Sequence, residues 1–257
     1  MSARKPSCCH CAGALAGVIA GGRRSRCGRV IADALDAAAV QEAVVRVRPD
    51  AVINELTALP RNYTPAEMAA SAERDRKVRI EGNANILAAL GAAGVRRYLL
   101  QSSAFWYAPG PGLADEREPF AVSGSPAVSA GSRRYAELEN AASMTPGIAV
   151  VALRYGFFYG PSTWFSDDGD MSEQIRHREV PVIGDGQGVW SWVHIEDAAT
   201  ATAAALECAP GAYNIVDDDP APQRVWLPAF AQAVGAPPPP GVSEAEATAA
   251  FGPDAVY

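Results

Sequence analysis

Between positions 94 and 107 the sequence reads Gly94-Val95-Arg96-Arg97-Tyr98-Leu99-Leu100-Gln101-Ser102-Ser103-Ala104-Phe105-Trp106-Tyr107. Gly94 predicts the end of a helix, residues 97–101 predict a short apolar strand, and two serines follow where this strand ends. In an open parallel sheet, ligands bind in the crevice outside the carboxyl ends of the strands. A serine at this place can hydrogen-bond a substrate oxygen, and Tyr107 can add a second hydroxyl. An ordinary strand that ends in polar residues explains the same stretch equally well.

The chain on both sides of this stretch alternates short apolar runs with helical stretches. Strands are predicted at residues 29–32, 50–54, 97–101 and 149–153, and helices at residues 37–46, 66–93, 132–142 and 243–251. Asp36 is placed to cap the first of these helices. Strands that alternate with helices indicate βαβ units and a parallel sheet, so we predict an α/β fold.

The composition changes after Gly156, where Gly, Pro and Asp become common. This change predicts a smaller region built from long loops. We therefore divide the chain into an atypical N-terminal segment (1–28), a sheet domain (29–156) and a smaller substrate-binding region (157–257) that interleaves with the last strands.

Bulk properties exclude several classes of protein. The formal net charge is -7 and no large basic face is evident, which argues against nucleic-acid binding. No apolar stretch approaches the ~20 residues that a membrane helix needs, and residues 12–22 make only a weak signal peptide, so we expect a cytoplasmic protein. Cys8-x-x-Cys11 supplies one pair of metal ligands without a second pair at a usual distance, so we expect no metal site.

The order of motifs from Asp33 onward resembles the NAD-dependent epimerase/dehydratase family, the extended or atypical short-chain dehydrogenase/reductases. The matching segments, within residues 30–236, are 33–36, 51–58, 81–87, 101–107, 153–161, 184–186, 192–199 and 213–216. The resemblance implies a Rossmann-like doubly wound parallel sheet with a small C-terminal substrate region. It also implies an NAD or NADP cofactor and a small-molecule substrate, and it allows a homodimer through the long helices.

The same resemblance assigns roles to particular residues. It implies that Asp33 contacts the adenine of the cofactor and that Ser103, four residues before Tyr107, hydrogen-bonds the reacting oxygen. The positions that it assigns to the cofactor are Asp33, Ala34, Leu56, Thr57, Ala58, Ser102 and Tyr155.

The N-terminal segment departs from the family pattern. A strand followed by Gly-x-x-Gly-x-x-Gly is expected, because its backbone N–H groups meet the pyrophosphate. Here Gly13, Gly17 and Gly21 recur every fourth residue, a spacing that places them on one helix face. We therefore expect that residues 1–28 are not family sequence, as after a frame error or a mistaken start, and that the chain also stops early.

The catalytic pair is a second departure. The family carries Tyr-x-x-x-Lys on the helix after the serine strand, and the lysine lowers the pKa of the tyrosine. Here Tyr135 has Glu139 at the lysine position, and a carboxylate there would raise the tyrosine pKa. In the alternative register Gly131 takes the tyrosine position and Tyr135 the lysine position. No lysine follows Lys77, so Tyr135 is either a neutral donor or a packing residue, and Tyr107 is a spare candidate acid.

Trp190 is a third departure, because nucleotide-sugar enzymes of the family tend to carry an arginine there to clamp a diphosphate. A tryptophan indicates a smaller and less charged substrate. We place Trp106, Phe158 and Trp190 in the substrate pocket, with core packing as the rival explanation for each.

These observations favour an NAD(P)-dependent oxidoreductase of the epimerase/dehydratase kind acting on a small alcohol, ketone or sugar-like compound. The missing glycine loop and lysine lead us to expect weak or absent cofactor binding. They also favour an alternative, a non-catalytic binding or regulatory relative with the same fold. A third reading is the non-functional product of a disrupted reading frame.

Overall fold

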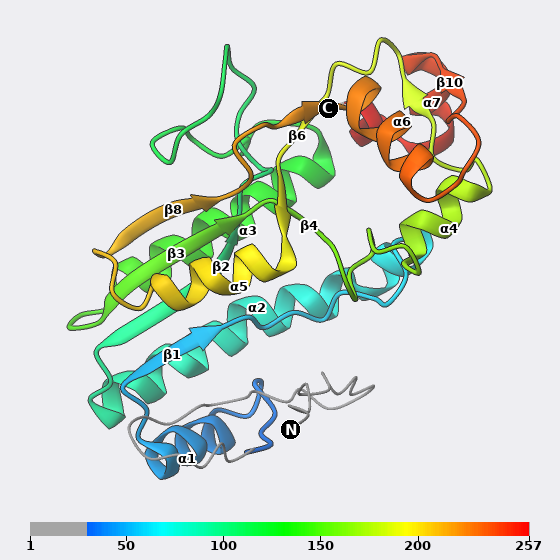
Figure 1. Ribbon diagram of the computed structural model, residues 1–257. Helices are drawn as coiled ribbons and strands as arrows, with labels where there is room; N and C mark the ends of the chain where they lie inside the picture. Colours follow the sequence, from blue (N-terminus) through cyan, green and yellow to red (C-terminus); the bar gives the residue numbers. More distant parts are fainter. Residues whose placement is uncertain (1–29, 257) are drawn as a thin grey trace, which may run out of the picture.

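The computed structural model describes residues 30–256, and a four-stranded parallel sheet lies at its centre (Figure 1). The strands follow one another across the sheet in the order β1-β2-β3-β8. Their bounds are Ala51–Asn54 (β1), Arg97–Ser103 (β2), Ala149–Tyr155 (β3) and Gly211–Ile215 (β8). Because the strands are parallel, their carboxyl ends meet at one edge, and the register places Ser103 beside Tyr155.

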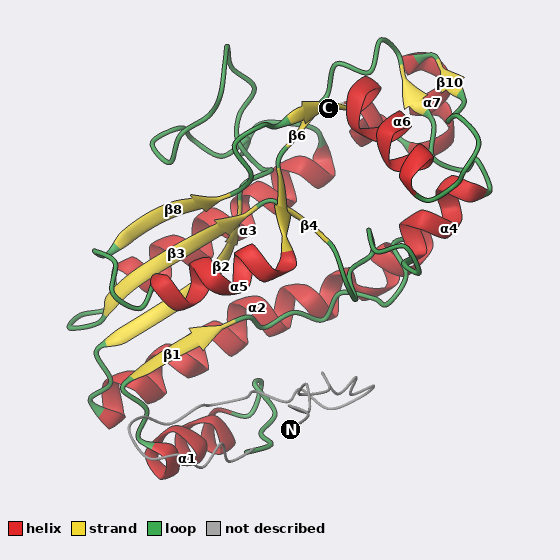
Figure 2. Cartoon of the chain, in the orientation of Figure 1, coloured by secondary structure: helices red, strands yellow, loops and turns green. Residues whose placement is uncertain are grey.

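Helices cover both faces of this sheet (Figure 2). One face carries α2 (Pro65–Ala93) and α3 (Pro126–Ser143), with α1 (Ala37–Val47) packed on α2, and the other face carries α5 (Ile195–Ala204). The α/β fold with a parallel sheet is thus confirmed.

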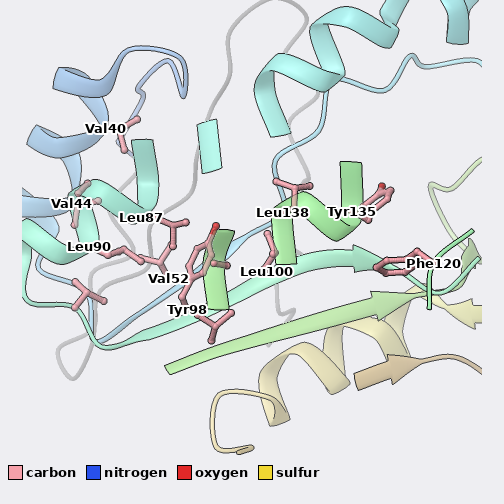
Figure 3. Close-up of a cluster of buried hydrophobic side chains, with 14 residues drawn as sticks. Val40, Val44, Val52, Leu87, Leu90, Tyr98, Leu100, Phe120, Tyr135 and Leu138 are labelled. Atoms are coloured by element: carbon pink, nitrogen blue, oxygen red, sulfur yellow. The ribbon is translucent and has the colours of Figure 1, made fainter. Parts of the chain in front are cut away.

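The two cores follow from the pleat of the strands. Tyr98 and Leu100 of β2 point into the core beneath α2 and α3, which Figure 3 shows. Leu99, between them, points to the opposite core together with Val151 and Leu153 of β3. Strands that are apolar on both faces are what a sheet covered on both sides requires.

Local sequence signals set the helix ends. The Asp36 side chain accepts hydrogen bonds from the N–H groups of Ala38 and Ala39, which makes it the N-cap of α1, as predicted. Gly94 ends α2 in the left-handed conformation (φ 72°), also as predicted. The helix α3 starts at Pro126, six residues before the predicted start.

The prediction of a strand at residues 29–32 is wrong for residues 30–32, the part of it that the structure describes. Val30, Ile31 and Ala32 have no regular structure, and Ile31 is 64% exposed. Arg29 lies outside the described residues. A run of three apolar residues makes a strand only where a neighbouring strand supplies hydrogen bonds, and between residues 30 and 256 no strand pairs with it.

The second half of the chain adds a smaller region of short strand pairs and helices. The strand pairs are β4 (Phe157–Tyr159) with β7 (Trp192–His194), β5 (Val182–Ile183) with β10 (Gly241–Val242), and β6 (Val189–Trp190) with β9 (Ala221–Pro222). The helices are α4 (Asp170–Arg176), α6 (Gln223–Ala233), α7 (Glu244–Phe251) and the 3-10 turn η1 (Pro253–Val256). Residues of this region form a third apolar core around Phe165 and Trp226. The domain boundaries stay predictions.

Candidate functional site

The carboxyl edge of the sheet gathers the residues that the sequence singled out. Glu55 follows β1, Ser102 and Ser103 end β2, and Tyr155 ends β3. The strands β1, β2 and β3 run outward in chain order, as in the second half of a doubly wound sheet. In such a sheet the ligand crevice lies where the strand order reverses, beside the first strand of that half. Glu55 directly follows β1, which is the edge strand of the described sheet.

Ser103 is buried, contrary to the expectation that it opens on a cleft. Its exposed fraction is 1%, and its Oγ accepts only a long hydrogen bond, 3.5 Å, from the N–H of Phe105. The backbone hydrogen bonds between β2 and β3 continue past Ser103, since the Ala104 N–H donates to the Tyr155 carbonyl. The position of a residue at the end of a strand does not by itself show which other side chains pack over that residue.

Ser102 belongs to a buried network on the opposite face, below α3. Its hydroxyl donates to Glu139 Oε1 at 2.5 Å. Arg154, 7% exposed, holds both oxygens of Glu139 at 2.9 and 2.7 Å and also donates to the Tyr107 hydroxyl at 2.8 Å. Tyr107 in turn donates to Asn214. Ser102, assigned to the cofactor by resemblance, is thus engaged with protein groups.

This network also corrects the roles expected for two residues. Glu139 is paired with Arg154, so it does not act on the pKa of Tyr135 as we expected. Burial raises the pKa of Tyr107, and the hydrogen bond from Arg154 opposes this only in part. Tyr107 is therefore a poor proton donor. Arg154 and Glu139 line a cavity of about 600 Å³ at the β8 side of α3.

Tyr135 lies in the core between the sheet and its helices. It is 9% exposed and belongs to the core beneath α2 and α3. Burial raises its pKa, and the guanidinium of Arg79 lies 5.6 Å from the centre of its ring. A phenol in this setting keeps its proton and stays neutral, which is compatible with packing and with a neutral donor role.

A buried charge cluster beside Tyr135 fixes the loop after β1. Asp75 (3% exposed) accepts from Arg79 at 2.9 Å, from the Thr57 hydroxyl at 3.0 Å and from the Ala58 N–H at 2.8 Å. Arg134 adds a longer contact of 3.3 Å to Asp75. The segment 56–58, expected to run beside the cofactor, is therefore held rigidly at the carboxyl edge.

Gly131 faces the indole of Trp106. A Cβ atom at Gly131 would lie 2.8 Å from Cζ2 of Trp106, closer than side-chain carbons approach one another. The indole thus fills the space next to the helix in which a side chain at position 131 would start. In the alternative register, Gly131 takes the tyrosine position of the family. The indole of Trp106 then lies where the side chain of that tyrosine would start.

Two of the three predicted substrate aromatics, Trp106 and Trp190, lie at one cluster of rings at the carboxyl edge. The distances between ring centres in this cluster are 5.3 Å for Trp106–Phe105, 4.4 Å for Phe105–Phe157 and 4.3 Å for Phe157–Trp190. Phe158 lies elsewhere, with Tyr155 in the core below α5. Phe105, which is not among the residues predicted for the pocket, is 39% exposed.

Asp33 and Ala34 lie at the far end of the same edge. Asp33 is exposed, and one of its carboxylate oxygens accepts from the N–H of Leu35 at 2.9 Å. Ala34 is 6% exposed and its carbonyl accepts from the Asn85 side chain. Asp33 is thus available to a ligand through its second oxygen, whereas Ala34 is a packing position.

A carboxylate that the sequence analysis did not single out completes the edge. The Tyr155 hydroxyl lies 3.2 Å from Glu55 Oε1 and 2.5 Å from the hydroxyl of Thr202 on α5. Glu55 is exposed as a residue, but protein atoms crowd its carboxylate, and this desolvation raises its pKa to about 7. Its hydrogen bond from Tyr155 and the charge of Arg79 act in the opposite direction. The sequence signal that could identify Glu55 is an acidic residue directly after an apolar strand.

Two negative observations hold for residues 30–256. No group of three or more His, Cys, Asp or Glu side chains in this range could hold a metal ion. None of its helices combines the length and the apolar character needed to cross a membrane.

Known proteins share both the sequence pattern and the fold. The sequence model of the NAD dependent epimerase/dehydratase family matches residues 8–215. The expectation that residues 1–28 are not family sequence is therefore wrong for residues 8–28. A 3-diazoavenalumate denitrifying reductase from a Streptomyces species is 41% identical over 215 residues, which cover 82% of this chain and 69% of that protein. A 2-alkyl-3-oxoalkanoate reductase from Stenotrophomonas maltophilia is 29% identical and is covered over 64% of its length, again against 82% of this chain. The chain thus spans about two thirds of these relatives.

Solved structures agree in fold. The UDP-glucose 4-epimerase of Thermus thermophilus, solved in complex with NAD, superposes with a TM-score of 0.62 at 24% identity, over 82% of this chain and 71% of that one. The human epimerase family protein SDR39U1, solved with NADPH, gives 0.65 at 21% identity, over 84% and 74%. The chain belongs to the NAD dependent epimerase/dehydratase family.

Proposed function

We propose that this protein is an NAD(P)-dependent reductase that acts on a small, flat, apolar ketone. The observation that carries the proposal is the stack of Phe105, Phe157 and Trp190 at the carboxyl edge, in which Phe105 is 39% exposed. A stack of this kind offers a ring face to a planar ligand and no charge to a diphosphate. The names of the two relatives, both reductases, support the same class of reaction.

The described residues fit the two ends of a dinucleotide. The free carboxylate oxygen of Asp33 suits the amino group of an adenine, and the segment 56–58, held by Asp75, suits a cofactor that passes along its backbone. The other end would lie at the carboxyl ends of β2 and β3, where Ser103 and Tyr155 are neighbours in the register and both side chains are buried. When bound, the reduced nicotinamide would supply a hydride. The position of the family's pyrophosphate loop falls within residues 1–29, outside the described part of the chain.

Cofactor titration tests this proposal. NADPH and NADH are titrated into the full chain while the nicotinamide fluorescence is followed, and NADPH oxidation is then measured with acetophenone and with cyclohexanone. We expect saturable binding and faster oxidation with the aromatic ketone. Absence of binding at millimolar NADPH and NADH would overturn the proposal.

A specific observation favours a second function, that of a binding protein without redox chemistry. Gly131 and Tyr135 stand where the family has its tyrosine and lysine in one register, and Trp106 fills the space that a side chain at position 131 would enter. Saturable cofactor binding without oxidation of NADPH by any ketone probe would support this second function instead.

Phe105→Ala is expected to weaken the binding of acetophenone. An aromatic pair contributes about 0.5–1.5 kcal/mol, so the inhibition or Michaelis constant should rise roughly 2- to 12-fold. The Michaelis or inhibition constant for cyclohexanone should change less, because cyclohexanone has no aromatic face. Phe251→Ala, another exposed phenylalanine on α7, is the matched control. Equal changes for both ketones would refute stacking on Phe105.

A further inference from the structure

Three oxygen-bearing side chains from separate elements form a chain at the carboxyl edge. Glu55 follows β1, Tyr155 ends β3 and Thr202 lies on α5. The spacings are 3.2 Å from Glu55 Oε1 to the Tyr155 hydroxyl and 2.5 Å from there to the Thr202 hydroxyl. The Thr202 hydroxyl is also 2.6 Å from the carbonyl of Ala198. The chain of hydrogen bonds runs from the carboxyl of Glu55 into the protein.

The hydrogen atoms can be arranged on this chain in two ways. If Glu55 carries a proton, it donates to Tyr155, Tyr155 donates to Thr202, and Thr202 donates to the Ala198 carbonyl. If Glu55 is ionised, Tyr155 donates to the carboxylate and Thr202 donates to Tyr155. The Tyr155 hydroxyl donates one hydrogen bond and accepts one in both states, and the Thr202 hydroxyl always donates one, so Glu55 can gain or lose a proton without leaving a buried hydroxyl unpaired.

The groups that face Glu55 come from four elements. Arg79 of α2 supplies positive charge, Tyr155 of β3 supplies a hydrogen bond, Tyr98 of β2 is a neutral phenol, and Thr202 of α5 is uncharged. Arg79 is itself paired with Asp75 at 2.9 Å. Desolvation therefore prevails and raises the pKa of the Glu55 carboxyl to about 7.

We propose that Glu55 is the proton donor of the reaction and that Tyr155 and Thr202 position it, in place of the family's tyrosine–lysine pair. This inference rests on the proposed function. The ketone carbon receives a hydride from the reduced nicotinamide, which is thereby oxidised, and the carbonyl π electrons move to oxygen. That oxygen takes the proton of Glu55, forming the alcohol O–H bond as the carboxyl O–H bond breaks. The carboxylate then takes a proton from water.

The other acids of the edge are less suited to this role. Tyr135 is buried in the core, and the Tyr107 hydroxyl is committed to Asn214 and Arg154. A general acid works best when its pKa is close to the operating pH, which a carboxyl at about 7 satisfies. Glu55 also follows β1, the edge strand of the described sheet, at the carboxyl edge where ligands of such sheets bind.

The titration of Glu55 can be measured without any ligand. The full chain is labelled with glutamate carrying ¹³C at Cδ, and its NMR signals are followed between pH 4 and pH 9. We expect one signal with a midpoint near pH 7 that is missing in Glu55→Gln and present in Glu81→Gln, an exposed glutamate of α2. Tyr155→Phe should move the midpoint upward, because it removes a hydrogen bond to the carboxylate. A midpoint in the ordinary range of glutamate, about 4.3, would overturn the proposal.

Kinetics test the proton transfer itself. With NADPH and acetophenone, Glu55→Gln should lower kcat about 100-fold or more while the NADPH dissociation constant stays unchanged. The wild-type kcat should fall as pH rises through 7, and the residual rate of Glu55→Gln should lose this dependence. Glu81→Gln should behave as wild type. Equal turnover of Glu55→Gln and wild type would overturn the role of Glu55 and leave the reductase proposal standing. Failure of the wild type to bind either cofactor would overturn both.

Discussion

Arg154→Leu is expected to lower the free energy of unfolding by about 3–5 kcal/mol, the usual cost of removing one partner of a buried ion pair. Arg154 is 7% exposed and makes two hydrogen bonds to Glu139 and one to Tyr107. Without the guanidinium, the Ser102 hydroxyl is the one hydrogen-bond partner that the Glu139 carboxylate keeps among residues 30–256. Urea denaturation at neutral pH measures the loss.

Two further variants separate this explanation from a general effect of losing an arginine. Arg117→Leu removes an exposed ion pair with Asp115 and should cost no more than about 1 kcal/mol. The double variant Arg154→Leu/Glu139→Leu should be more stable than Arg154→Leu alone, because no unpaired charge is left in the protein. If Arg154→Leu cost no more than Arg117→Leu, the buried pair would not be a stabilising element.

Gly131→Tyr, which restores the family's tyrosine in one register, should destabilise the protein by about 3 kcal/mol, the upper range for overpacking a core. The reason is the 2.8 Å distance between a Cβ at this position and the Trp106 ring. Gly91 of α2 provides the matched control, since no atom lies within 4 Å of its added Cβ, and Gly91→Tyr should be nearly neutral.

A double-mutant cycle locates the clash. Combined with Trp106→Ala, Gly131→Tyr should cost less than the two single changes add up to, by about 1–3 kcal/mol of coupling. Additive effects would mean that the indole does not limit position 131. Thermal unfolding of the four proteins under one set of conditions supplies all the terms of the cycle.

The sequence was informative where a signal is local. Thr64 and Pro65 open α2 and Gly94 closes it, and the helix was predicted to within one residue at each end. Likewise, Ser243 begins α7 with a capping box to Glu246. These features depend on residues a few positions apart, and the family resemblance followed from the order of such segments.

The candidate site was less accessible to sequence reasoning, because its contacts join distant segments. Glu55 and Thr202 are linked through Tyr155 only because β1, β2 and β3 pair in one particular register. Ser103 has the expected place at the end of β2, but whether it is exposed depends on which side chains pack over it. Local pattern carries no information on either point.

The elevated pKa of Glu55 also links acidity to folding. In an unfolded chain this carboxyl would titrate near 4.5, whereas in the folded protein it titrates near 7, so the native state binds the proton more tightly. Its contribution to stability is therefore complete below about 4.5 and is lost as the solution is made alkaline through 7. The titration of Glu55, taken alone, should lower the melting temperature between pH 5 and pH 8. Mildly acidic buffers should therefore suit purification and storage.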